Sequence, residues 1–253
     1  MKLPTNAFLS ALRSGTPQIG LWISLASNVA AEVVADAGFD WVLLDMEHSP
    51  NELPVVLSQL QVFASRDTTA IVRPQWNDPV LVKRLLDVGA EGLLFPMVQN
   101  ATEADAAVAA TRYPPRGIRG VSGTTRANRF GRIGDYFSRV EDETAVLLQV
   151  ETREALATAS EIGERDGVDG VFFGPADISA SLGHLGQPMH PETWDLIRAT
   201  AKPLMDRGVP VGTLVFDPAL ARQLIDEGFS FVACGSDLAL LARGADALHA
   251  AMR

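Results

Sequence analysis

Two carboxylates follow two apolar runs that are neighbours along the chain. Glu151 comes directly after AVLLQV, and Asp177 comes shortly after GVFFG. Because parallel strands end at the same edge of a sheet, where α/β proteins place their chemistry, we expect both carboxylates at one end of the sheet. Two oxygen ligands, with positions left for water or substrate, suit Mg²⁺ or Mn²⁺. Each carboxylate alone could simply cap a helix, but their equivalent positions, with Gln149 beside one and Gly174-Pro175-Ala176 before the other, favour a metal site.

Further polar side chains follow two other apolar runs. The run DWVLL leads into Asp45, Glu47 and His48, and the run TAIV ends at Arg73. A lone histidine is more often structural than catalytic, but this one shares a loop with two acids, which would fix its tautomer and raise its basicity. A guanidinium offers a fork of donors to a carboxylate or to a developing oxyanion. We therefore predict a general base and an anion clamp at the same end of the sheet.

Together these residues suit proton chemistry next to a carbonyl group. Backbone N–H groups of Gly174–Ala176 can hold a substrate carboxylate, a metal can polarise a 2-oxo acid, and a cation can steady the enolate. Schiff-base chemistry would need a lysine at a strand end, and Lys2, Lys83 and Lys202 do not follow strands. The positions of the lysines therefore argue against a lysine-dependent aldolase.

The other three histidines carry weaker signals. His184 and His190 lie in a loop rich in Gly and Pro, and His249 lies in the terminal helical segment. We expect all three at the surface rather than in a ligand set.

Eight apolar runs, each followed by a helical pattern, would position these residues. Strict alternation of strand and helix over this length, without a linker, predicts an α/β fold of the (β/α)₈ TIM-barrel type, with residues 1–253 as a single domain. The expected strands are 18–25, 40–44, 69–72, 92–95, 145–150, 170–174, 209–214 and 229–233.

Residues 113–143 interrupt this alternation. The segment carries six arginines and shows no clear strand. A long irregular insertion in a compact domain is usually functional or forms an interface. Its glycines do not follow a strand, so it contains no dinucleotide-binding fingerprint.

Composition excludes several classes of protein. A hydrophobic content of 47% with 21% charged residues is typical of a globular chain, and a net charge of −10 opposes nucleic-acid binding. Cys234 is the only cysteine and cannot form an internal disulfide. No apolar stretch suits a signal peptide or a membrane span, so we expect a cytoplasmic protein with no membrane or nucleic-acid partner.

Six motifs of the chain resemble those of the HpcH/HpaI aldolase family. They are LLDMEHSPN, VRPQWNDP, LLDVGAEGLLFPMVQN, RYPPRGIRGV, QVETREA and DGVFFGPADIS, and the resemblance runs from about residue 5 to the end. It implies a phosphoenolpyruvate/pyruvate-type barrel whose C-terminal helix is exchanged between subunits of a homo-hexamer, a trimer of dimers. It also implies a metal-dependent class II aldolase. Such an enzyme reversibly cleaves 4-hydroxy-2-oxo acids, for example 4-hydroxy-2-oxoheptanedioate, to an aldehyde and pyruvate or hydroxypyruvate, through a metal-stabilised enolate.

The resemblance also implies a role for individual residues. Glu151 and Asp177 match ligands of Mg²⁺, Mn²⁺ or Co²⁺, His48 matches the base, and Arg73 matches the residue that stabilises the pyruvate enolate. Gln149, Ala176 and Asp177 match substrate contacts, which we extend to Gly174, Pro175 and Leu214.

Two acids complete the expected catalytic set. Asp45 lies in the loop of His48. Asp87 matches an acid that makes the histidine more basic, although it ends a helix far from its own barrel's mouth, so we expect a neighbouring subunit to supply it.

Two alternatives remain open at this point. Sugar-acid aldolases of the same family, acting on 2-dehydro-3-deoxy-glucarate, use nearly the same site and differ where the aldehyde binds. A non-catalytic barrel that binds small acids would lack proton exchange at C3 of pyruvate, which a metal-dependent aldolase shows.

Overall fold

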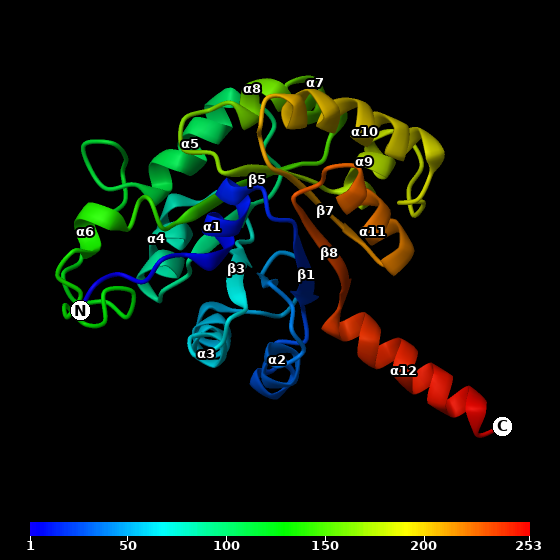
Figure 1. The fold of residues 1–253 in the computed structure, drawn as a ribbon, viewed down its shortest axis with the longest axis horizontal. Coiled ribbons are helices and arrows are strands. Elements are labelled where there is room, and N and C mark those ends of the chain that lie inside the picture. Colours follow the sequence, from blue (N-terminus) through cyan, green and yellow to red (C-terminus); the bar gives the residue numbers. More distant parts are fainter.

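Eight parallel strands close into a barrel in the computed structural model, which describes residues 1–253 (Figure 1). The strands are β1 (Gln18–Ile23), β2 (Trp41–Asp45), β3 (Thr69–Arg73), β4 (Gly92–Phe95), β5 (Ala145–Val150), β6 (Gly170–Phe173), β7 (Val211–Val215) and β8 (Phe231–Ser236). Each strand pairs with the next along the chain, and β8 pairs with β1. The predicted barrel is confirmed. The largest boundary difference is at β8, which ends at Ser236 rather than Ala233.

Helices surround the barrel, and most begin at a polar residue that caps them. They are α1 (Ala7–Ser14), α2 (Asn28–Ala35), α3 (Leu53–Phe63), α4 (Pro79–Asp87), α5 (Ala101–Thr111), α6 (Tyr136–Arg139), α7 (Arg153–Ala157), α8 (Ala159–Gly163), α9 (Pro175–Ser181), α10 (Pro191–Asp206), α11 (Pro218–Asp226) and α12 (Asp237–Ala251). In the caps before α2 and α4, the side chains of Ser27 and Asp78 accept a backbone N–H of the first turn. The helical stretch predicted between β5 and β6 is divided into α7 and α8 at Thr158.

Aromatic side chains fill the interior of the barrel. Alternate residues of each strand point inward, and Trp41 and Phe231 meet there at 6.0 Å between ring centroids. Phe8 of α1 packs on both rings, at 5.6 and 5.7 Å, and so covers the end of the barrel opposite the mouth. Gly20 and Gly212 make room for these rings, because a Cβ would lie 2.3 Å from the Trp41 ring and 2.4 Å from the Phe231 ring. The interior is thus a packed core, and polar groups gather at the strand ends.

The arginine-rich insertion between α5 and β5 contains only the one-turn helix α6. Its Arg119 has a fully buried side chain and donates from Nη2 to Asp87 Oδ1 at 3.0 Å and to the Tyr136 hydroxyl at 3.1 Å. The same guanidinium lies 4.5 Å from the Tyr113 ring centroid. These contacts fasten the insertion to the end of α4, while Ile118 and other apolar side chains of the insertion stay exposed.

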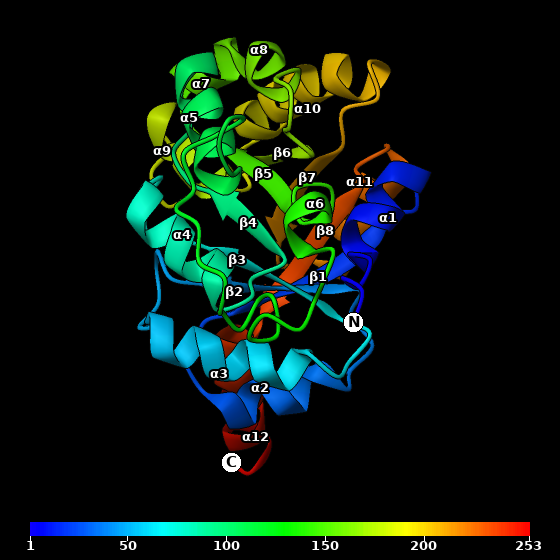
Figure 2. The same cartoon turned by 90° about the vertical axis from the view of Figure 1, so that its left-hand side faces the viewer.

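Helix α12 leaves the barrel after β8 and extends away from it (Figures 1 and 2). Its base is fixed, because the Asp237 carboxylate accepts the backbone N–H groups of Ser24 at 2.8 Å and Leu25 at 3.2 Å. Beyond the base its apolar side chains lie in solvent, and Leu238, Leu240, Leu241 and Leu248 are each more than half exposed. The helix therefore covers no face of its own barrel. None of the helices has the length and apolar character needed to cross a membrane.

Candidate active site

Polar residues form the last inward-facing layer at the carboxyl ends of the strands. The interior core includes Leu43, Ile71 and Leu147, and the residues two positions further along the same strands are Asp45, Arg73 and Gln149. Because side chains alternate between faces, these three also point inward. The predicted site residues of β2, β3 and β5 therefore meet at one mouth.

Arg73 is the centre of a buried ion-pair network in this mouth. Its Nε and Nη2 each donate to one Asp45 oxygen at 2.9 Å, and its Nη1 lies 2.9 Å from Glu47 Oε2. Burial opposes the charge of Arg73, but the hydrogen bond and charge of Asp45 outweigh it and raise the pKa of the guanidinium. A guanidinium has five N–H groups. Asp45 occupies two of them and Glu47 lies against Nη1, so two N–H groups remain for a ligand.

Asp45 also shapes the loop that carries His48. Its Oδ1 accepts the backbone N–H groups of Glu47 at 3.0 Å and His48 at 3.4 Å, and its backbone carbonyl accepts Asn51 Nδ2 at 2.8 Å. The carboxylate is bonded to Arg73 and to backbone, not to the imidazole. Its contacts position Arg73 and the His48 loop, and the catalytic role expected for Asp45 from the sequence stays a prediction.

The His48 side chain follows β2 and is largely exposed to solvent. It is 67% exposed, and its Nε2 lies 3.7 Å from Glu47 Oε1, too far for a hydrogen bond. Burial raises the pKa of the Glu47 carboxyl, and the charges of Arg73 and His48 oppose that rise. The acid nearest the imidazole in this chain is thus Glu47.

Glu151 is 1% exposed and is held by hydrogen bonds from uncharged groups. Its Oε1 accepts the Met97 backbone N–H at 2.7 Å, and its Oε2 accepts Gln149 Nε2. Its pKa is raised to about 7, mainly by burial and in smaller part by the charges of Asp177 and Glu47, although both hydrogen bonds lower it. No basic side chain forms an ion pair with this buried carboxylate.

The turn into α9 lies directly against Glu151. A Cβ on Gly174 would be 2.7 Å from Glu151 Oε2 and 3.2 Å from Gln149 Nε2, so only glycine fits there. Pro175 is buried, whereas Ala176 and Asp177 are exposed on the first turn of α9. Gly174 thus allows the turn that carries Asp177 to approach Glu151.

This donor set fits a hard divalent cation. Glu151 and Asp177 supply carboxylate oxygens, and Gln149 Oε1 is buried without a hydrogen-bond partner, as an acceptor for a metal-bound water would be. A cation would also compensate the uncompensated charge of Glu151.

Two further predicted residues lie at different ends of the barrel. Leu214 of β7 is half-buried against the interior core near the mouth, which suits a lining residue. Asp87 ends α4 and is bonded to Arg119, away from the mouth of its own chain, as the sequence led us to expect.

Sequence reasoning missed the contribution of Met97. Its φ of 55° is unusual for a residue other than glycine, and this conformation accompanies the hydrogen bond from its N–H to Glu151. Gln99 Nε2 donates to the Met97 carbonyl at 3.1 Å, and Gln99 Oε1 accepts from the Thr152 hydroxyl. Gln99, the glutamine of PMVQN, was the only residue of this segment whose type indicated that the backbone of Met97 is held in place.

Known proteins resemble this chain over almost its whole length. Residues 18–244 match the model of the family described as HpcH/HpaI aldolase/citrate lyase. A pyruvate aldolase of Rhizobium etli is 55% identical over 250 residues, covering 99% of this chain and 98% of the relative. A 4-hydroxy-2-oxo-heptane-1,7-dioate aldolase of Klebsiella pneumoniae is 54% identical over 97% of this chain and 93% of the relative.

A solved structure supports the same assignment. A HpcH/HpaI aldolase/citrate lyase family protein from Burkholderia cenocepacia superimposes with a TM-score of 0.94 at 39% identity, covering 98% of this chain and 100% of that one. The chain therefore belongs to the HpcH/HpaI aldolase family.

Proposed function

We propose that this protein is a divalent-metal-dependent aldolase that reversibly cleaves 4-hydroxy-2-oxo acids to an aldehyde and pyruvate, or a related acid such as hydroxypyruvate. The observation that carries the proposal is the buried Glu151 carboxylate, with which no basic side chain forms an ion pair, beside the unpaired Gln149 Oε1. Aldolases named for pyruvate and for 4-hydroxy-2-oxo-heptane-1,7-dioate at 55% and 54% identity support the reaction class and the substrate.

Glu151 and Asp177 hold the cation in this proposal. Mg²⁺, Mn²⁺ or Co²⁺ bound there would withdraw electron density from the 2-oxo group. The negative charge that C3 acquires when the C3–C4 bond breaks would thereby be stabilised. Gln149, with its free Oε1, and the turn Gly174–Ala176 orient the 2-oxo acid beside it. Leu214 lines the wall of the mouth.

His48 moves the proton in this proposal. In the cleavage direction a base takes the proton of the 4-hydroxyl, the C3–C4 bond breaks, and its electron pair passes to the 2-oxo acid fragment as an enolate while the aldehyde leaves. The enolate is then protonated at C3. Arg73 stabilises the growing negative charge with the N–H groups that neither Asp45 nor Glu47 engages. Asp45 keeps both Arg73 and the His48 loop in place.

A neighbouring subunit completes the site in this proposal. The exposed apolar side of α12 needs a partner surface, and Val29 and Val33 of α2 present exposed apolar side chains of their own. Exchange of α12 between two copies, within a trimer of dimers, would cover both. The same assembly would bring Asp87 of one subunit to His48 of another. The single-domain organisation and the cytoplasmic location remain predictions.

Proton exchange at C3 of pyruvate tests the proposal directly. Exchange followed by NMR in ²H₂O should stop after chelation and return with Mg²⁺, Mn²⁺ or Co²⁺, and the Glu151→Gln variant should show none. Elemental analysis of the chelated sample provides the control. Undiminished exchange in a metal-free sample would refute metal dependence, and no exchange under any condition would indicate a barrel that only binds small acids.

An aldehyde panel then identifies the second substrate. Succinic semialdehyde, which aldol addition of pyruvate converts to 4-hydroxy-2-oxoheptanedioate, should be used faster than tartronate semialdehyde. The reverse order would favour the sugar-acid aldolase alternative.

A further inference from the structure

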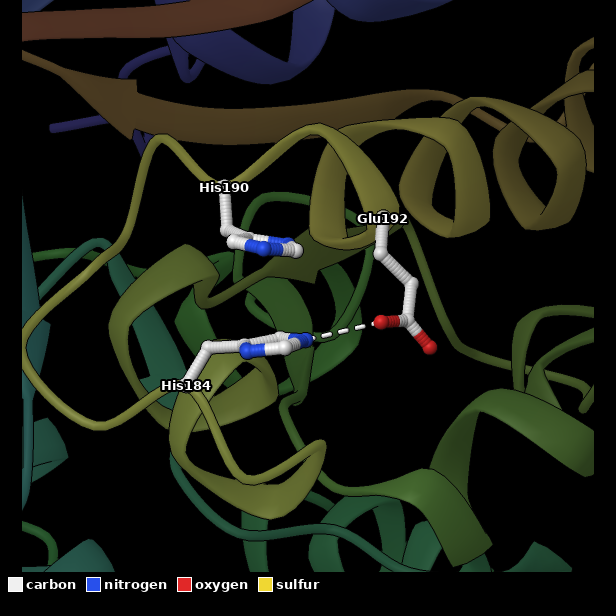
Figure 3. Close-up of side chains that lie close together, drawn as sticks. All are labelled: His184, His190 and Glu192. Atoms are coloured by element: carbon white, nitrogen blue, oxygen red, sulfur yellow. Dashed lines mark hydrogen bonds and ion pairs between the residues drawn. The ribbon is translucent and has the colours of Figure 1, made fainter.

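Two histidines and a glutamate meet between α9 and α10, outside the site described above (Figure 3). His184 Nε2 lies 2.7 Å from Glu192 Oε2, and the rings of His184 and His190 stack with centroids 3.5 Å apart and an interplanar angle of 15°. One potential ligand atom from each of the three residues lies within 4.8 Å of the others. The sequence led us to expect His184 and His190 at the surface, and the structure places them half-buried and stacked on each other.

The three side chains have the chemistry of a metal-ligand set. Two imidazoles beside a carboxylate are a combination found in zinc sites. Each of the three residues offers one nitrogen or oxygen atom to the shared space between them.

His190 has an unused nitrogen in this cluster. Its Nδ1 is buried and has no hydrogen-bond partner, and its side chain makes no capping hydrogen bond to α10, which it precedes. A buried polar atom without a partner is costly, and a metal ion would satisfy it.

We propose that His184, His190 and Glu192 bind one Zn²⁺ ion, with water in the fourth position. Bonds of about 2.1 Å in a tetrahedron place ligand atoms about 3.4 Å apart. His184 Nε2 and Glu192 Oε2, now 2.7 Å apart, must therefore separate slightly, and no pair of ligand atoms in the cluster is more than 4.8 Å apart at present. A metal lies in the plane of the imidazole that binds it, so one of the stacked rings must also turn. The side chains of the segment Leu185–Met189 between the histidines are exposed, so a turn of one ring need not displace them from a packed core.

The ion would tie the loop to the helix that carries a proposed ligand of the catalytic metal. Ser179 of α9, two residues after Asp177, has its Oγ 2.7 Å from the carbonyl oxygens of both His184 and Gln187. Zn²⁺ would add a link from this loop to Glu192 on the first turn of α10. We therefore assign the ion a structural role, separate from catalysis.

Zinc binding by a protein without the catalytic carboxylates tests this proposal. Tag-free Glu151→Gln/Asp177→Asn protein should retain one equivalent of Zn²⁺ per chain in calorimetry and elemental analysis, and Zn²⁺ should raise its melting temperature. His184→Ala in the same background should lose both effects. His249→Ala, which removes a histidine from exposed α12, is the matched control and should keep them.

Spectroscopy covers the case in which His184→Ala fails to fold. X-ray absorption of the Zn²⁺-loaded background protein should show two imidazole ligands. Coordination by oxygen alone, no bound Zn²⁺ in the background protein, or unchanged binding in folded His184→Ala would each overturn the proposal.

Discussion

Replacing Glu151 by glutamine should remove a pH-dependent loss of stability from the metal-free protein. The folded-state pKa of about 7 lies above the usual 4.5, so the folded protein binds this proton more tightly than the unfolded chain does. The stability from this group is complete below pH 4.5 and is lost as the pH rises through 7. At 1.36 kcal/mol per pH unit, the difference of about 2.5 corresponds to about 3 kcal/mol.

The assay compares two proteins rather than two conditions. Melting temperatures of the wild type and Glu151→Gln, both in chelator, should be measured from pH 4.5 to 8.5. Between pH 5 and 8 the variant should gain about 6–12 °C relative to the wild type, at about 2–4 °C per kcal/mol for a chain of this size. Glu154→Gln, which removes an exposed carboxylate three residues away, controls for the change in net charge.

Added Mg²⁺ should cancel the effect in the wild type alone. A cation must displace the Glu151 proton, so its apparent affinity should fall about tenfold for each pH unit below 7. A difference in melting temperature between the two metal-free proteins that stays constant from pH 5 to 8 would refute the reasoning. Burial would then not raise the pKa of Glu151.

Four further changes test other parts of the molecule. His48→Ala should lower pyruvate proton exchange about 10²–10⁴-fold while calorimetry still detects pyruvate binding, and exchange at the wild-type rate would place the base elsewhere. Arg73→Lys keeps a charge but loses the planar fork, so turnover should fall about 10²–10³-fold and pyruvate affinity should fall with it. Gly174→Ala should weaken metal binding about 10–100-fold in calorimetry, because its Cβ would lie 2.7 Å from Glu151 Oε2. Leu241→Asp on α12 should dissociate the proposed assembly and lower the sedimentation coefficient. An unchanged sedimentation coefficient would contradict a role for α12 in subunit contacts.

The barrel and the main site residues were predictable because both follow from strand periodicity. Strands buried on both faces are continuous apolar runs, and a polar residue that ends such a run must lie at the carboxyl edge. Arg73 and Glu151 were found in this way. Their partners depend on register, which the sequence does not display, and Asp45 meets Arg73 because the two are paired across β2 and β3.

Other features depend on backbone geometry or on distant contacts. Met97 acts through its N–H and a positive φ, and no side-chain type signals either. The stacking of His184 on His190 depends on how a loop folds back, and six residues of separation do not determine that path. The apolar residues of α12 indicate that this helix packs against another surface. The sequence does not indicate whether that surface belongs to the same chain or to a second subunit.

The attachment of α12 through its base alone makes the stability of this protein depend on its concentration. Asp237 hydrogen-bonds the base of the helix to the residue that follows β1, next to the pairing of β1 with β8 that closes the barrel. The leucines further along the helix are exposed, so they contribute no burial to the folding of a single chain. If a second copy covers those leucines, part of the stability of each subunit comes from association and follows mass action. The melting temperature should then rise with protein concentration, and dilution should loosen the barrel first at the β1–β8 seam.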